Sequence, residues 1–338
     1  MNRKLERQKV QQQVQDDDLY EKLERFIIDR LEDKKDYTDI SWKKLGNIFD
    51  DHHAQLPVVD VLEDKIRVYY STRKDGKSLP MFFDVSSEDV TSVMSRSPEP
   101  LLNLGKPGSF DWSGVMPTCI VNHKGVKYMY YIGWSQRIDV PYHNTLGLAI
   151  SEDGETWKKY SEGPVFGTST KEPGYIGTAE VLIENGVWRM WYLSCRDWVE
   201  HDGRMEPLYD IKYAESLDGV SWDPKNITAI HLLEGEGGVS AARVIKTVSG
   251  YEMFFSVRKE KDYRSKKSCS YRILKATSKD GMTWKREDRI EIAPSHLRWE
   301  NFMTCYPAIA RVKDETYMFY NGNDFGKTGI GCAIKVHK

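Results

Sequence analysis

Short apolar strands that lead through a turn into aromatic-rich strands recur five times along the chain. The five aromatic segments read RVYYSTR, YMYYIGW, RMWYLSC, EMFFSVR and YMFYNGN. Each has the aromatic and β-branched content of a buried strand, and none has the apolar spacing of a helix. Their central residues are Tyr69, Tyr130, Trp191, Phe254 and Phe319, which lie 61 to 65 residues apart. The repeat predicts an all-β fold, a five-bladed β-propeller whose loops surround one central pocket.

A second repeat marks the turn into the outer strand of three blades. The segments 151–157, 216–222 and 278–284 share a Ser at their first position, Asp-Gly at the third and fourth, and Trp at the seventh. Asp-Gly favours a tight hairpin turn because both residues tolerate positive φ. The pattern resembles the Asp-box hairpin of sialidases. It predicts a structural turn with a packing Trp, and no catalytic role for the three aspartates.

The repeats also predict how the ring closes. The fifth unit ends after its third strand, and a segment similar to the missing outer strand lies at residues 41–49. We expect this N-terminal strand to complete the last blade, because an open edge would invite pairing with other chains. The propeller domain would then span residues 39–338.

Residues 1–38 differ from the rest of the chain. Leu19, Leu23, Phe26, Ile27 and Leu31 lie at helical spacing and form one apolar stripe. This pattern predicts a short, charged α-helical extension that docks on the propeller or on another subunit. The second alternative would make the protein a homo-oligomer.

Composition narrows the class of protein. The 49 basic and 51 acidic residues give a net charge of −2, which does not suggest nucleic-acid binding. No apolar run is long enough to span a bilayer, and no signal-like segment follows Met1. The five cysteines are scattered and form no CxxC pair. Reduced thiols of this kind favour a cytoplasmic protein. The sequence predicts no cofactor.

Loop position indicates which face carries chemistry. In a four-stranded blade, the loops that lead into the inner strands share one face with the loops between the second and third strands. The Asp-Gly turns must then lie on the opposite face. Several of these second loops are longer than a hairpin needs, and such loops are commonly functional. Their carboxylates, arginines, histidines, amides and tryptophans predict a carbohydrate pocket on the ring axis.

Several stretches carry a resemblance to a known group of proteins. They are His53–Gln55, Phe110–Asp111, Gly114–Pro117, Tyr130–Trp134, Pro141–Asn144, Tyr209–Ser216 and Tyr320–Asn323. With them, the chain resembles the five-bladed propeller superfamily of arabinanases, β-xylosidases, levansucrases and invertases. It is most similar to glycosidase-like proteins encoded in bacterial surface-polysaccharide clusters. The resemblance implies a carbohydrate-active protein.

One departure from this superfamily bears on activity. The resemblance implies an Asp, an Asp and a Glu at the starts of the first three inner strands. The equivalent segments here are Ala54–Pro57, Val115–Pro117 and Gly177–Ala179, and none contains a carboxylate. Glycoside hydrolysis normally needs two carboxyl groups that flank the bond. The catalytic residues of the superfamily therefore cannot be assigned to this chain position by position.

Three other acids are candidate catalytic groups. Asp111 lies between aromatic residues just before the second inner strand, so burial would favour an acid role. Its alternative role is to cap a turn. Asp210 and Glu180 are the next candidates, and an ion pair with Arg243 or Arg258 is the alternative for Glu180.

Nine residues are candidate sugar ligands. They are His53, Gln55, Arg73, Trp134, His143, Trp198, Arg258, Asn321 and Asn323. Arg73 and Arg258 end equivalent strands, and a pair of guanidinium groups at the axis would suit an acidic sugar or a sugar nucleotide. Pairing with acids of the funnel is the alternative. No spacing of histidines or oxygen ligands predicts a metal.

Two carbohydrate-related functions remain open from the sequence, beside a purely structural interaction propeller that uses its rim and N-terminal helix. The first is a glycosidase-like hydrolase or transglycosylase that acts on a polysaccharide unit or precursor in the axial funnel. The second is a non-catalytic sugar-binding propeller in a polysaccharide biosynthesis assembly, which the missing triad favours. Both depend on His53, Asp111, His143, Asp210 and Arg258 opening into the same axial cavity.

Overall fold

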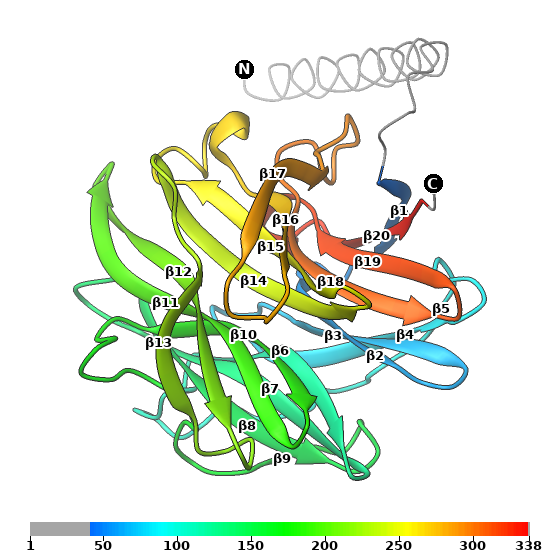
Figure 1. Ribbon diagram of the computed structural model, residues 1–338, viewed down its shortest axis with the longest axis horizontal. Coiled ribbons are helices and arrows are strands. Elements are labelled where there is room, and N and C mark those ends of the chain that lie inside the picture. The colour runs from blue at the N-terminus through cyan, green and yellow to red at the C-terminus, as the bar shows by residue number, and fades with distance from the viewer. Residues whose placement is uncertain (1–40, 337–338) are drawn as a thin grey trace, which may run out of the picture.

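The computed structural model describes residues 41–336, and over this range the chain forms a ring of five four-stranded antiparallel blades (Figure 1). Two short 3-10 helices, η1 (Lys267–Cys269) and η2 (Asn323–Gly326), lie in loops. The predicted all-β, five-bladed architecture is confirmed. The extension predicted for residues 1–38 lies outside the described residues. No helix among the described residues is long and apolar enough to cross a membrane.

Within each blade the strands follow one another from the axis outward. Blade 1 contains β2 (Gln55–Val61), β3 (Lys65–Ser71), β4 (Pro80–Ser86) and β5 (Val93–Arg96). Blade 2 contains β6 (Gly114–His123), β7 (Val126–Gln136), β8 (Tyr142–Ser151) and β9 (Lys158–Lys159). Blade 3 contains β10 (Ile176–Glu184), β11 (Val187–His201), β12 (Arg204–Ser216) and β13 (Asp223–Ile230). Blade 4 contains β14 (Glu236–Thr247), β15 (Gly250–Lys259), β16 (Arg272–Ser278) and β17 (Lys285–Ile292).

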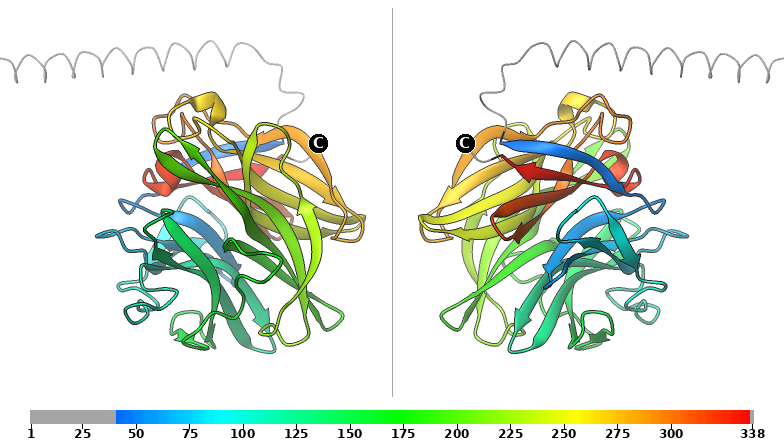
Figure 2. Two further views of the ribbon diagram at one scale, coloured as in Figure 1. Left: turned by 90° about the vertical axis from the view of Figure 1, so that its left-hand side faces the viewer. Right: turned by 90° about the vertical axis from the view of Figure 1, so that its right-hand side faces the viewer.

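Blade 5 joins the two ends of the described chain. Its strands β18 (Cys305–Val312), β19 (Glu315–Asn321) and β20 (Ile330–Lys335) are completed by β1 (Trp42–Phe49), which pairs antiparallel with β20 (Figure 2). Trp42 anchors β1 to blade 4, because its Nε1 donates to Glu291 at 2.9 Å and its ring meets Phe254 edge-on at 5.6 Å. The predicted ring closure by residues 41–49 is confirmed.

The Asp-Gly turns are structural, as predicted. Asp153 Oδ1 accepts hydrogen bonds from the amides of Glu155 and Thr156 at 2.8 and 2.7 Å. Asp218 and Asp280 make the same pair of bonds in their own turns. Amide donors to an ionised carboxylate fix the hairpin, so these aspartates are committed to the turn.

The aromatic repeat and the Asp-Gly repeat meet between blades. The hydroxyls of Tyr69 and Tyr130 and the indole N–H of Trp191 donate to the glycine carbonyl of the Asp-Gly turn in the next blade. These bonds measure 2.8, 2.6 and 2.7 Å. The equivalent residues Phe254 and Phe319 cannot donate, and the blades that follow them lack the turn. A Tyr or Trp donor is therefore present in each blade whose next neighbour has the Asp-Gly turn.

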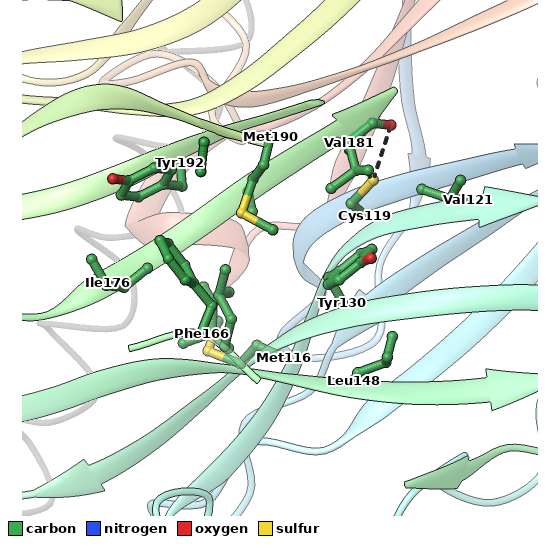
Figure 3. Packing of buried hydrophobic residues seen from close by; sticks show 14 of the residues in the cluster. Met116, Cys119, Val121, Tyr130, Leu148, Phe166, Ile176, Val181, Met190 and Tyr192 are labelled. Carbon is green, nitrogen blue, oxygen red and sulfur yellow. Dashed lines mark hydrogen bonds between the residues drawn. The ribbon is translucent and has the colours of Figure 1, made fainter. Parts of the chain in front are cut away.

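Apolar side chains fill the space between neighbouring blades. Between blades 2 and 3, buried residues such as Met116, Tyr130 and Met190 pack together (Figure 3). Similar clusters occupy the other blade interfaces. Burial of apolar surface stabilises a fold by roughly 25 cal/mol per Å2. These interfaces are therefore the main source of stability of the ring. The ring is thus held by contacts from blade to blade.

We expect Tyr130→Phe to lower the free energy of unfolding by about 1–3 kcal/mol, because it removes the only side-chain donor that the described structure gives the Gly219 carbonyl. Tyr69→Phe is the matched control. The Gly154 carbonyl keeps its bonds from Arg67 and Trp157, so the loss should be about 0.5–1.5 kcal/mol. Denaturant unfolding of both variants measures this. Equal losses would contradict the dependence of the Gly219 carbonyl on Tyr130 alone, since Tyr69 makes the same bond between blades.

Candidate functional site

Each inner strand begins with an irregular register. The shifts lie between Gln55 and Val58, Pro117 and Cys119, Ile176 and Ala179, Ser240 and Arg243, and Cys305 and Ala308. A β-bulge re-aims the side chains around it. Because all five bulges lie at the same end of the inner strands, they decide which side chains face the ring axis at that end.

Neighbouring blades hold these bulges by hydrogen bonds. Leu56, Ala241 and Tyr306 have φ values of 61°, 52° and 56°, a strained region for side chains of this size. Their amides donate to Asn321 Oδ1, Thr178 Oγ1 and Ser256 Oγ at 2.8, 2.9 and 2.8 Å. The amide of Ala179 donates in the same way to Thr118 Oγ1. The polar side chain of one blade therefore fixes the axial backbone of the next.

The bulges surround an axial funnel of about 440 Å3 to which all five blades contribute. Its polar lining consists of His53, Gln55, Arg73, Gln136, Asn144, Thr178, Arg204, Ser240 and Arg264. Six tyrosines complete it: Tyr142, Tyr175, Tyr209, Tyr263, Tyr271 and Tyr306. Ser240 is 3% exposed, and its hydroxyl has no hydrogen-bond partner in the described part of the chain. The funnel is the candidate site because its lining comes from the whole ring.

No carboxylate lines the funnel among residues 41–336, whereas three arginines do. Arg264 and Arg204 share one carboxylate, Glu206, which lies buried behind the lining at 2.9 and 3.4 Å. Arg73 has no ion pair within the described residues and lies over the Trp134 ring at 5.3 Å. The lining therefore carries a net positive charge, which favours an anionic ligand.

The acidic residues of the loops that lead into the inner strands are bound by side chains of their own blades. Asp51, Asp111, Glu172 and Glu300 each accept a hydrogen bond from a tyrosine of the second strand at 2.8 to 3.3 Å. Each also pairs with a cation of the third or fourth strand: Arg96, Lys159, Lys212 and Lys44, respectively. In blade 4, Glu236 pairs with Arg286, whose guanidinium lies over Phe255. We call these five arrangements the carboxylate braces.

Asp111 does not line the funnel, contrary to the expected shared cavity. It is 1% exposed and is held by Lys159 Nζ at 2.5 Å, Ser109 Oγ at 2.9 Å and Tyr131. Its position matches the other braces, which recur every 60 to 64 residues. The brace explains the position of Asp111. Its catalytic role stays a prediction, because Asp111 makes no contact with the funnel.

Asp210 and Glu180 also lie outside the lining. Asp210 accepts from the Leu232 amide at 2.8 Å and pairs with Arg196 at 3.3 Å. Glu180 follows Thr178 along β10 and pairs with Arg243 at 3.3 Å, the alternative predicted for it. Burial raises the pKa of Glu180 to about 7, although Arg243 opposes the shift. The structure thus brings none of the three candidate acids into the funnel.

Four of the nine predicted sugar ligands line the funnel: His53, Gln55, Arg73 and Trp134. His143 instead lines a neighbouring hollow of about 550 Å3. Trp198 packs behind the lining against Tyr142 and Tyr175, with ring centroids 5.7 Å apart in both pairs.

The remaining three predicted ligands hold backbone. Asn321 is fully buried and bonds the Leu56 amide and the carbonyls of Ala54 and Gly329. Asn323 accepts from the amides of Phe302 and Met303. Arg258 lies beneath the funnel and donates to the carbonyls of Pro207 and Lys259. Asn321 and Asn323 therefore position the loops that shape the site.

The tyrosines of the lining were missed by sequence reasoning. Nineteen tyrosines in the chain made packing between blades the natural interpretation. A usable signal was position, because Tyr175, Tyr271 and Tyr306 all lie next to the starts of strands on the funnel face. Burial raises the pKa of Tyr142 to about 12. Its phenol is a neutral hydrogen-bond donor at physiological pH.

His53 and His143 are neutral at physiological pH. Burial lowers the pKa of His53, although its ring Nε2 lies 3.2 Å from Gln55 Oε1. Burial also lowers the pKa of His143, and the nearby Arg137 adds to the effect. Both rings can donate or accept a hydrogen bond to a sugar hydroxyl.

Comparison with known proteins places the chain in a family. A protein of Mycobacterium tuberculosis described as uncharacterized protein Rv1502 is 33% identical over 312 residues, which cover 87% of this chain and 99% of the relative. The chain belongs to the same family as this mycobacterial protein. No family model matches the chain.

Solved structures show the fold of this family. A GH130 structure, from work on mannoside phosphorylases and glycoside hydrolases that target β-1,2 mannosidic linkages in Candida mannan, superposes with a TM-score of 0.65 at 16% identity and covers 85% of both chains. A thermostable family-43 glycoside hydrolase gives a TM-score of 0.61 at 13% identity, over 84% of this chain and 88% of the other. The structure of a BT0996 complex with RGII gives a TM-score of 0.65 at 18% identity, over 92% of this chain and 95% of the other. The predicted resemblance to five-bladed glycosidases is confirmed for the fold.

The braces predict that Asp111→Asn and Glu172→Gln act through stability. Each variant removes the negative charge opposite a half-buried lysine, so we expect each to lower the free energy of unfolding by about 1–3 kcal/mol. Denaturant unfolding measures both. A stable Asp111→Asn protein beside a destabilised Glu172→Gln protein would show that Asp111 does not act as a brace.

Glu180 predicts a pH dependence of stability. A carboxyl whose folded pKa lies above its usual value stabilises the fold below that usual value, and this contribution is lost as the pH rises toward the folded pKa. We therefore expect stability to fall between about pH 4.5 and 7. Glu180→Gln should remove this part of the slope. Unfolding at a series of pH values checks this, and equal slopes for both proteins would contradict it.

Proposed function

We propose that the axial funnel binds a carbohydrate that carries a carboxylate or phosphate group. The observation behind this proposal is a lining with three arginines, six tyrosines and no carboxylate among the described residues. Arg73 supplies a guanidinium without an ion pair in that range, and phenol hydroxyls and Ser240 supply hydrogen bonds to sugar hydroxyls. Aromatic rings such as Trp134 provide flat apolar faces.

The same observation argues against hydrolysis by two flanking carboxyl groups, which this mechanism needs about 5–10 Å apart across the bond. Asp111, Glu172 and Glu180 are already bound by Lys159, Lys212 and Arg243. A glycosidase-like hydrolase or transglycosylase is the second candidate, and Glu180 favours it. Its pKa of about 7 suits proton transfer, and it lies two residues beyond Thr178 of the lining.

The similar structures support a carbohydrate ligand. The BT0996 propeller is a complex with RGII, and it covers nearly the whole of the described ring. The shared fold belongs to glycoside hydrolases and phosphorylases. We further propose a cytoplasmic location, on the composition of the chain and its scattered thiols.

Thermal unfolding with a panel of sugars tests the proposal. Uronates and sugar phosphates should raise the unfolding temperature, whereas the matched neutral sugars should not. A ligand at 100 times its Kd stabilises a protein by about 2.7 kcal/mol. The shift should shrink with added salt, because the attraction is electrostatic. Stabilisation by neutral sugars alone would remove the anionic ligand from the proposal.

Arg73→Gln should weaken binding of the anionic sugar about tenfold or more, because a hydrogen bond between charged groups contributes about 1.5–3 kcal/mol. Arg311→Gln is the matched control. Arg311 lies at the far end of inner strand β18, where it donates to the Lys246 carbonyl. Its substitution should leave affinity unchanged, and equal losses in both variants would point to net charge rather than to the funnel.

A further inference from the structure

Arg258 is a buried cation without a carboxylate partner in the described part of the chain. It is 2% exposed, and its Nη atoms donate to backbone carbonyls at 2.9 and 2.5 Å. Its guanidinium lies 4.0 Å from the Tyr263 ring centroid and 5.0 Å from that of Tyr209. An uncompensated charge is costly to bury. Such a group is a candidate for function because carbonyls and rings compensate it only in part.

One hydroxyl of the funnel connects directly to this cation. Arg258 Nε donates to Tyr209 Oη at 3.2 Å, and the Tyr209 and Tyr271 hydroxyls form a short hydrogen bond with each other. Both tyrosines line the funnel. When ionised, the Tyr209 oxygen would accept from Arg258 and from Tyr271, and its negative charge would compensate Arg258. The other phenol next to the cation, Tyr263, donates to Glu206 instead.

The funnel therefore holds groups that move protons and groups that bind an anion, without a carboxylate pair. We propose that it catalyses β-elimination on a uronic-acid glycan, with Tyr209 as the general base and Tyr271 as the acid. Abstraction of a proton next to a carboxylate needs a base and a cation that stabilises the resulting dianion. Tyr209 supplies the base, and Arg73 supplies the cation. The inference rests on the proposed function, since it assigns a reaction to the same funnel.

The step is balanced. The ionised Tyr209 oxygen takes the proton from the carbon that bears the carboxylate. The electron pair of that C–H bond forms a carbon–carbon double bond, and the glycosidic C–O bond on the next carbon breaks. The leaving oxygen takes the proton of Tyr271. The direct hydrogen bond between the two phenols then returns a proton from Tyr209 to Tyr271 and restores the starting state. Neither water nor an oxidant is consumed.

The geometry also predicts the stereochemistry. The base and the acid are hydrogen-bonded neighbours, so the proton and the leaving group must depart from the same face of the sugar. His53 is the other neutral group of the lining that could take a proton. Its ring bonds Gln55, and after burial the nearby Arg73 and Lys327 also lower its pKa, so we assign it to binding.

Purified full-length protein incubated with oligogalacturonate, oligoglucuronate and oligomannuronate tests the proposal. The expected result is an unsaturated uronate from the glucuronate and mannuronate chains, in which H5 and O4 lie on the same face of the sugar, and none from the galacturonate chain, in which they lie on opposite faces. The product is detected by its ultraviolet absorbance and by mass spectrometry as cleavage without addition of water. Tyr209→Phe should lower the rate about 100-fold or more. The Tyr209→Phe protein should still be stabilised by the same oligosaccharide. If the Tyr209 phenol only shaped the funnel, the substitution would change binding instead of the rate.

Tyr213→Phe is the matched control. Tyr213 lies on the same strand, β12, and its hydroxyl accepts from Arg189 Nε at 2.6 Å outside the funnel. The control should keep the wild-type rate. Stabilisation by a uronate without unsaturated product would overturn elimination and leave the anionic-sugar funnel standing. No stabilisation by any of the acidic sugars would overturn both. Loss of product in His53→Gln but not in Tyr209→Phe would overturn the assignment of the base.

Discussion

The carboxylate braces decide the character of the whole ring. In every blade an acid that leads into the inner strand is held by a cation of the third or fourth strand, and in four blades also by a tyrosine. A paired and hydrogen-bonded carboxylate can be buried without a large loss of stability. The braces fasten the loops at the mouth of the ring, and they keep their negative charges away from its axis.

The funnel has its positive character because of this arrangement. With the acids bound inside the blades, arginines and phenols remain at the axis. Glu206 shows the same division, since it lies behind Arg264 and Tyr263 instead of beside them in the lining. Burial opposes ionisation of Glu206, but hydrogen bonds from Arg264 and Tyr263 hold its pKa below the usual value. The shared propeller fold therefore carries a site whose chemistry differs from a pair of carboxylates.

The fold could be predicted from the sequence because its signals are local and repeated. Tyr69 and its counterparts mark the second strands, and the Asp-Gly turns and residues 41–49 mark the outer ones. The site was less predictable. A bulge such as the one at Leu56 depends on Asn321, 265 residues away, so the direction of nearby side chains cannot be read locally. Asp111 did carry a signal, since its spacing from Asp51 and Glu172 equals the blade repeat. A residue that recurs in every blade belongs to the architecture.

The pairing of β1 with β20 has a consequence for synthesis of the chain. The ribosome makes β1 before the other strands of the ring, so β1 has no strand partner until β20 has been made. Four blades can assemble in order as they emerge. The fifth must wait for β20, and until then the edge of β1 is free to pair with another chain. Closure of the ring is therefore the last step in the assembly of the five blades.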